Sequence, residues 1–190
     1  MNLPNKLTLL RVILVPFFVF FLLTEFMDAR ISCICALAVF AAASITDALD
    51  GHIARSRNLV TNFGKFLDPL ADKVLVISAL VCFVKLGFAG AVPVLIIIAR
   101  EFMVSGLRLV AAGEGVVVAA GIWGKLKTAF TMIAIVVILL FAVIFGKDPA
   151  VYETWAVVTE QILIWISAVL TIISGIDYLK GYGKFIDPNE

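Results

Sequence analysis

Four aspartates stand at helical spacing in a short polar stretch of an otherwise apolar chain. Asp47 and Asp50 lie three positions apart, and Asp68 and Asp72 lie four positions apart. Residues at these spacings share one face of a helix, so each pair would present two carboxylates together. Clustered carboxylates repel one another unless they bind cations, and ligands made only of oxygen favour Mg²⁺ or Mn²⁺ over zinc. The spacing therefore predicts a site for two divalent cations, which together can clamp a phosphoryl group.

The elements that position these aspartates are predicted to be membrane-spanning helices. The chain has 190 residues, of which 63% are hydrophobic and 15% charged, and its mean hydropathy is +1.12. This composition is too apolar for an ordinary soluble domain. Six stretches reach the roughly 20 residues that a helical span needs. We expect the spans at Leu7–Phe26, Ile31–Ile53, Leu67–Leu86, Ala91–Ala112, Leu126–Phe145 and Tyr152–Leu179.

The short connections predict one all-α membrane domain over residues 1–190. Strands are not expected, because no stretch alternates apolar and polar residues as a membrane β-barrel requires. With the amino terminus in the cytoplasm, 12 of the 15 Lys and Arg residues fall on the cytoplasmic side. They are Lys6, Arg11, Arg55, Arg57, Lys65, Lys73, Arg100, Arg108, Lys125, Lys127, Lys180 and Lys184. This bias predicts that both termini are cytoplasmic.

The amino-terminal segment is predicted to form a helical stretch at the membrane interface. Asn5, Thr8 and Arg11 recur every three residues and fall along one side of that helix. Two interpretations remain open. These polar residues face lipid headgroups, or Thr8 and Arg11 close the site of the aspartates.

Two glycines flank the aspartates. Gly51 follows Asp50, and Gly64 lies one turn before Asp68. A missing side chain lets a bulky ligand approach the backbone, although helix packing would explain each glycine taken alone. Arg55 is close in sequence and could contact a phosphate or a base.

Together these residues form a pattern that resembles the signature of the CDP-alcohol phosphotransferase family. The string Asp47-x2-Asp50-Gly51-x2-Ala54-Arg55-x8-Gly64-x3-Asp68-x3-Asp72 matches that signature at every defined position. The resemblance implies six membrane helices, two Mg²⁺ or Mn²⁺ ions and a reaction that releases CMP. It implies that Asp47, Asp50 and Asp68 are metal ligands and that Asp72 is a ligand, the general base, or both. The residues that it implies for the cytidine diphosphate site are Gly51, Ala54, Arg55, Gly64 and Asp68.

The resemblance extends beyond the signature. The strings NLPNKLTLLRVILVP, GKFLDPLADK, IIAREFMVSGLR and GKLKT, between residues 2 and 128, are similar to bacterial members of the family. These members transfer a phosphatidyl group from CDP-diacylglycerol to glycerol 3-phosphate. The similarity implies the same reaction here, in the bacterial cytoplasmic membrane among its lipids. It also implies a homodimer and an active site that faces the cytoplasm.

Basic residues near the cytoplasmic ends of the fourth and fifth spans give independent support for a phosphorylated acceptor. Buried cations need anions, and a phosphate-bearing acceptor would supply one through charge-assisted hydrogen bonds. Arg108 and Lys125 are the favoured phosphate contacts, followed by Arg100, and Lys127 is a candidate contact to a lipid headgroup. Cytoplasmic retention and binding of anionic lipids are the alternative explanation for this basic set.

Three other functions stay open on the sequence. Inositol phosphate or serine would be acceptors within the same family. The aspartates would also suit a divalent-cation transporter, although such sites usually lie near the membrane midplane, whereas these cluster at one end. A catalytically silent scaffold is disfavoured, because burying acidic residues without a function is costly. The net charge of +1 gives no reason to expect a nucleic-acid partner.

Overall fold

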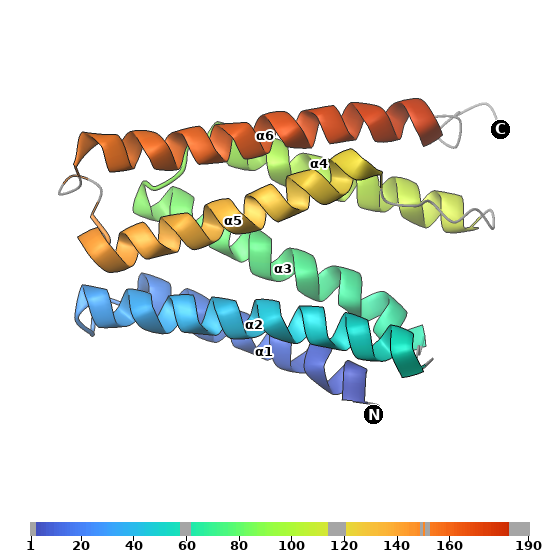
Figure 1. Cartoon of the computed structure of the whole chain (residues 1–190), viewed down its shortest axis with the longest axis horizontal. Coiled ribbons are helices and arrows are strands. Elements are labelled where there is room, and N and C mark those ends of the chain that lie inside the picture. Colours follow the sequence, from blue (N-terminus) through green and yellow to red (C-terminus); the bar gives the residue numbers. More distant parts are fainter. Residues whose placement is uncertain (1–2, 58–61, 114–120, 149, 151–152, 183–190) are drawn as a thin grey trace. The chain divides into compact units, whose positions relative to one another are not determined.

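The computed structural model describes residues 3–57, 62–113, 121–148, 150 and 153–182. Among these, the side chains of residues 3–6, 47–57, 62–70, 72 and 182 lie outside the description. The helices are α1 (Leu3–Leu23), α2 (Ala29–Arg57), α3 (Asn62–Leu86), α4 (Ala91–Gly113), α5 (Ile122–Phe145) and α6 (Thr154–Tyr182). Figure 1 labels the helices and colours them along the sequence, and no strand occurs in the described residues. The predicted all-α class and the six helices are confirmed.

The helices match the predicted spans, but two of them are longer at the ends that carry the aspartates. The second helix continues to Arg57 instead of ending at Ile53, and the third begins at Asn62 instead of Leu67. By length and hydropathy, parts of α2, α5 and α6 can cross a membrane, and α1 contributes a shorter apolar stretch. Charged residues lower the hydropathy of α4, which carries Arg100, Glu101 and Arg108. The chain therefore has at least three helices suited to a membrane.

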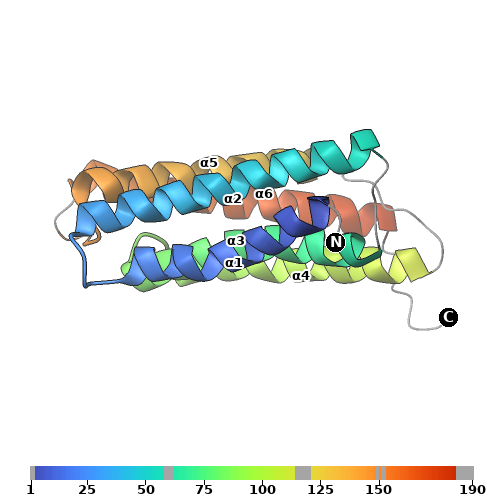
Figure 2. The ribbon, with the colours of Figure 1, turned by 90° about the horizontal axis from the view of Figure 1, so that it is seen from below.

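The chain divides into two compact units. The first contains Met1–Gly87 and Val136–Tyr152, and the second contains Phe88–Ile135 and Glu153–Glu190. In the first unit α1 packs against both α2 and α3 (Figure 2). Phe18 of α1 and Phe40 of α2 are fully buried, with ring centroids 5.6 Å apart and tilted rings. The contact adds aromatic packing to the burial of apolar surface.

In the second unit α4 and α6 lie side by side (Figure 1). Three hydrogen bonds join residues 90, 100 and 108, at or within α4, to residues 161, 174 and 178 of α6. Both sets of numbers increase together, so the two helices run parallel. Before α4 begins, the backbone N–H of Gly90 donates to Gln161 Oε1 at 3.2 Å. Farther along, Arg100 donates to Ser174, and Arg108 donates to Tyr178. The α4–α6 pair therefore brings the two arginines of α4 to the carboxyl-terminal half of α6.

Local signals set several helix ends in the first unit. Asp28 caps α2, because its Oδ1 accepts hydrogen bonds from the backbone N–H groups of Arg30 at 3.0 Å and Ile31 at 3.2 Å. Such a cap satisfies donors that have no partner inside the helix. Gly87 and Gly146 follow the ends of α3 and α5 with φ of 81° and 103°. Glycine enters this left-handed region without steric cost, so both helices end where the sequence permits it.

Lys147 ties the loop after α5 to the end of α1. Its Nζ donates to the carbonyl oxygens of Phe21 at 3.3 Å and Thr24 at 2.7 Å, and to Ser32 Oγ at 2.5 Å. The last carbonyls of a helix have no partner within it, and a cation at that end is favourable. Lys147 is one of three cations that did not fit the predicted cytoplasmic bias, and this contact gives it a structural role.

Replacing Lys147 with Met should therefore lower the free energy of unfolding by about 1.5–3 kcal/mol, the usual range for hydrogen bonds to a charged group. The methionine keeps much of the side chain's length but cannot donate to the two carbonyls. Chemical unfolding in detergent micelles measures the change. Lys85→Met is the matched control, because Lys85 is an exposed cation in the last turn of α3. Equal stability of the two variants would show that the Lys147 contacts contribute nothing.

Candidate active site

The four aspartates lie on the two helices that sequence reasoning assigned to them. Asp47 and Asp50 fall within α2, and Asp68 and Asp72 fall within α3. Because α3 begins before Gly64, the positions 64, 68 and 72 share one face by helical register, as predicted. The side chains of all four aspartates lie outside the described part of the chain, so their role as metal ligands stays a prediction.

The residues implied for the cytidine diphosphate site fall on the same helix segments. Gly51, Ala54 and Arg55 lie near the end of α2, and Gly64 lies in the first turn of α3. Their side chains also lie outside the described part. What the backbone establishes is the helical register that the signature requires.

Thr8 and Arg11 belong to the first helix of the structure, and their side chains are buried. They lie within α1, which is one continuous helix from Leu3 to Leu23. Thr8 is 0% exposed and Arg11 is 1% exposed. A side chain that faced lipid headgroups would be accessible, so the interpretation in which Thr8 and Arg11 face headgroups is wrong. The position of Thr8 and Arg11 agrees with the other interpretation, in which they face inward.

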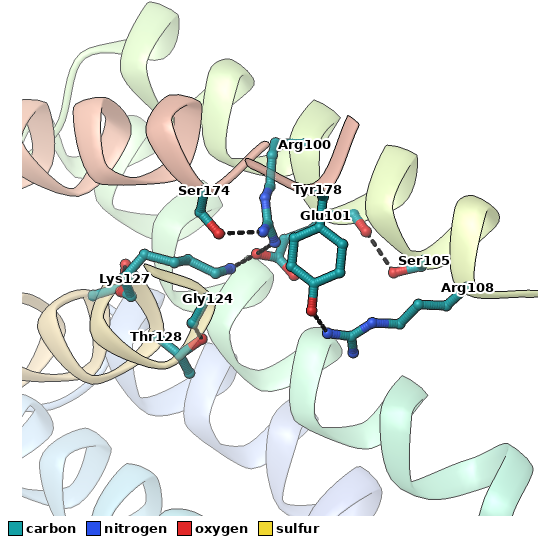
Figure 3. A network of polar contacts seen from close by, with 10 residues as sticks. Arg100, Glu101, Ser105, Arg108, Gly124, Lys127, Thr128, Ser174 and Tyr178 are labelled. Carbon is teal, nitrogen blue, oxygen red and sulfur yellow. Dashed lines mark hydrogen bonds and ion pairs between the residues drawn. The ribbon is translucent and has the colours of Figure 1, made fainter. Parts of the chain in front are cut away.

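The second unit contains a polar cluster made by Arg100, Glu101, Lys127 and Ser174 (Figure 3). Arg100 Nη2 donates to Ser174 Oγ at 2.5 Å, and its Nη1 lies 3.6 Å from Glu101 Oε1. Lys127 of α5 forms an ion pair with the same carboxylate. Arg100 and Lys127 are both buried, and a buried charge is costly unless it is paired. Glu101 therefore compensates two buried cations at once.

Arg108 is the exposed cation beside this cluster, and its contact partner is Tyr178 of α6. Arg108 Nη2 hydrogen-bonds the tyrosine hydroxyl (Figure 3). Its guanidinium carbon also lies 5.1 Å from the ring centroid of Tyr178, and that of Arg100 lies 5.3 Å from the same centroid. Both distances are within the range of cation–π attraction. Arg100 and Lys127 each pair with the Glu101 carboxylate, whereas the partner of Arg108 in the described residues is the neutral Tyr178.

Lys125 is exposed in the first turn of α5 and joins none of the side-chain contacts that the structure gives for this cluster. The structure thus separates the four predicted basic residues into three environments. Arg100 and Lys127 are buried and ion-paired, Arg108 is exposed against a phenol ring, and Lys125 faces outward.

Sequence reasoning missed the contribution of α6. Ser174 and Tyr178 stand one helical turn apart among apolar residues, and that spacing was the available signal. Gly175, between them, has no side chain. A Cβ added at Gly175 would lie 3.3 Å from Arg100 Cγ, so the glycine makes room for the arginine. The close contact is with α4 of the same chain.

Comparison with known proteins agrees with the signature on α2 and α3. Residues 1–173 match the family model described as CDP-alcohol phosphatidyltransferase. A Bacillus subtilis protein named CDP-diacylglycerol–glycerol-3-phosphate 3-phosphatidyltransferase is 43% identical over 188 residues, covering 94% of each chain. Proteins of the same name from Rickettsia bellii and Haemophilus influenzae are 39% and 38% identical. The match to the Rickettsia bellii protein covers 97% of each chain. The match to the Haemophilus influenzae protein covers 98% of this chain and 96% of the relative.

The family match covers α1 to α5 and α6 as far as residue 173, and thus both aspartate pairs. It includes Arg100, Glu101 and Lys127 and ends just before Ser174. The chain belongs to the CDP-alcohol phosphatidyltransferase family.

Proposed function

We propose that the protein transfers the phosphatidyl group of CDP-diacylglycerol to glycerol 3-phosphate, giving phosphatidylglycerophosphate and CMP. The observation that carries this proposal is the similarity to three proteins named for that reaction over at least 94% of each chain. The aspartate signature on α2 and α3 supports the transfer chemistry. Membership of this family favours transfer over cation transport.

The chemistry of the donor set fits a pair of hard divalent cations. Asp47 and Asp50 share one face of α2 by register, and Asp68 and Asp72 share one face of α3. All four supply carboxylate oxygens, the ligands that Mg²⁺ and Mn²⁺ prefer. When bound, such ions would neutralise negative charge on the diphosphate and on the departing CMP.

The residues of the chain would then divide the work between the two substrates. Gly51, Ala54, Arg55 and Gly64 would hold the cytidine diphosphate of the lipid. A hydroxyl of glycerol 3-phosphate would attack the phosphorus that carries diacylglycerol, and the bond to CMP would break. We assign Asp72 as the group that accepts the proton of the attacking hydroxyl, a role that requires it to reach this hydroxyl.

The basic residues would bind the phosphate of the acceptor. The described contacts favour Arg108, because Glu101 already compensates Arg100 and Lys127. An exposed guanidinium with a neutral partner keeps its charge for an incoming phosphate, which it can bind through two parallel hydrogen bonds. Arg100 and Lys125 would assist Arg108. Thr8 and Arg11 would close the site from α1, and Lys127 would be a candidate contact to a lipid headgroup.

We also propose six membrane crossings with both termini in the cytoplasm, and an active site that faces the cytoplasm. The excess of Lys and Arg on that side supports this orientation. The resemblance to the family supports the bacterial cytoplasmic membrane as the location, a homodimer as the assembly, and a single domain over residues 1–190.

An assay of the purified protein in detergent tests the function. CDP-diacylglycerol and Mg²⁺ would be supplied with glycerol 3-phosphate, serine, inositol or inositol phosphate in turn. We expect CMP and phosphatidylglycerophosphate with glycerol 3-phosphate, and little CMP with the other alcohols. CMP formed with serine or inositol phosphate, but not with glycerol 3-phosphate, would overturn the proposed acceptor.

A further inference from the structure

Two side chains of α6 hold the two arginines of α4, and neither belongs to the sequence signature. Ser174 Oγ accepts from Arg100 Nη2 at 2.5 Å, and the Tyr178 hydroxyl binds Arg108 (Figure 3). We propose that Tyr178 and Ser174 are positioning residues that orient Arg108 and Arg100 toward the phosphate of the acceptor. This inference rests on the proposed function and adds two specificity-determining residues to it.

The environment of Tyr178 explains how one ring can fix two cations. Tyr178 lies on α6 and is 2% exposed, so the packing around it holds its ring in place. The guanidinium carbons of Arg100 and Arg108 lie 5.3 and 5.1 Å from the ring centroid. The negative face of an aromatic ring attracts a cation, so the ring offsets part of the repulsion between two like charges.

The contact leaves Arg108 able to bind an anion. A guanidinium has five N–H donors in a rigid fork, and the tyrosine hydroxyl engages one nitrogen, Nη2, in the described contacts. An arginine that is already oriented loses less conformational freedom when a ligand binds. Tyr178 thereby lowers the entropic cost of phosphate binding without supplying charge itself.

Arg100 differs from Arg108 in that both of its terminal nitrogens already have side-chain partners. Arg100 is buried, and it meets Ser174 through one terminal nitrogen and Glu101 through the other. Lys127 pairs with the same carboxylate, so Glu101 serves two cations, and Arg108 adds a third positive charge at the ring of Tyr178. The excess positive charge suits a phosphate monoester, whereas an uncharged alcohol gains nothing from it. The cluster therefore selects for an acceptor that carries phosphate.

The test compares Tyr178→Phe, Tyr178→Leu and Ser174→Ala with the unmodified protein. The Phe variant keeps the ring and loses the hydroxyl, so the KM for glycerol 3-phosphate should rise about 3- to 10-fold, as expected for one hydrogen bond. The Leu variant also loses the ring, and its KM should rise further. Ser174→Ala also removes one hydrogen bond to an arginine, so it should raise this KM too, by no more than the Phe variant does, and an unchanged KM would remove Ser174 from the proposal. The KM for CDP-diacylglycerol should stay within about twofold, since none of these residues is assigned to the lipid site.

A second readout separates positioning from a general loss of structure. The preference for glycerol 3-phosphate is the kcat/KM for glycerol 3-phosphate divided by the kcat/KM for glycerol. This ratio should fall in the Phe variant and should fall further in the Leu variant. A misfolded site would lower both values together and leave the ratio unchanged. Trp165→Leu, on the exposed side of α6, is the matched control and should change neither value.

Equal KM changes for both substrates, or an unchanged ratio in the Leu variant, would overturn the positioning role. If the Leu variant does not fold, the Phe variant decides the question alone. Failure of the proposed function is a different result, in which the unmodified protein forms no CMP with glycerol 3-phosphate.

Discussion

Asp72→Asn should lower turnover about 10³-fold, within the range that general-base catalysis contributes. Asparagine has nearly the same shape as aspartate, but it cannot accept the proton of the attacking hydroxyl and is a weaker ligand for a divalent cation. Asp72 ends the signature on α3, at the register position that it shares with Asp68 and Gly64. CMP release from CDP-diacylglycerol and glycerol 3-phosphate measures the loss.

Binding of CDP-diacylglycerol to the Asp72→Asn variant should survive in part, because Gly51, Ala54, Arg55 and Gly64 are unchanged. Equilibrium binding of labelled CDP-diacylglycerol in detergent measures it. Asp148→Asn is the matched control, since Asp148 is an exposed aspartate in the loop after α5. Turnover near that of the unmodified enzyme would remove Asp72 from catalysis.

The second large effect concerns Arg108. Arg108→Ala should raise the KM for glycerol 3-phosphate by about 10- to 100-fold, which corresponds to roughly 1.4–2.8 kcal/mol of charge-assisted hydrogen bonding. The reason is that Arg108 is an exposed cation beside the cluster, and its partner Tyr178 is neutral. Steady-state kinetics with each substrate varied in turn measures the effect, and the KM for CDP-diacylglycerol should hardly change.

Two comparisons make the Arg108 result specific. Lys180→Ala removes another exposed cation, in the last turn of α6, and should leave both KM values unchanged. Lys125→Ala should have a smaller effect than Arg108→Ala, because Lys125 lies outside the contacts of the cluster. Equal increases in both KM values for the Arg108 variant would assign it a structural role.

The helices and the register of the aspartates could be predicted because local rules determine them. A membrane requires its spans to satisfy their own backbone hydrogen bonds, so long apolar stretches become helices. Once α2 and α3 are helices, the intervals from Asp47 to Asp50 and from Asp68 to Asp72 place each pair on one face. The helix ends were predicted less well, since α2 and α3 continue into polar residues that hydropathy alone would exclude.

Contacts between distant parts of the chain could not be predicted from spacing. Arg108 and Tyr178 are 70 residues apart, and Lys147 reaches Thr24 across 123 residues. Which helices pack together depends on the whole sequence, and one polar residue in a helix does not identify its partner on another. The inward direction of Thr8 and Arg11 was undecided for the same reason, because their three-residue spacing suits a lipid interface and a protein interior equally.

The central claim is that the aspartates of α2 and α3 hold two divalent cations that the reaction requires. Mn²⁺ binding to the purified, chelator-treated protein tests it most directly, with the bound ions counted per chain and CMP formation followed in parallel. We predict about two Mn²⁺ per chain, no CMP before Mn²⁺ is added, and loss of both ions and activity in an Asp47→Asn, Asp68→Asn double variant. Full activity in the metal-free protein, or undiminished Mn²⁺ binding in the double variant, would contradict the claim.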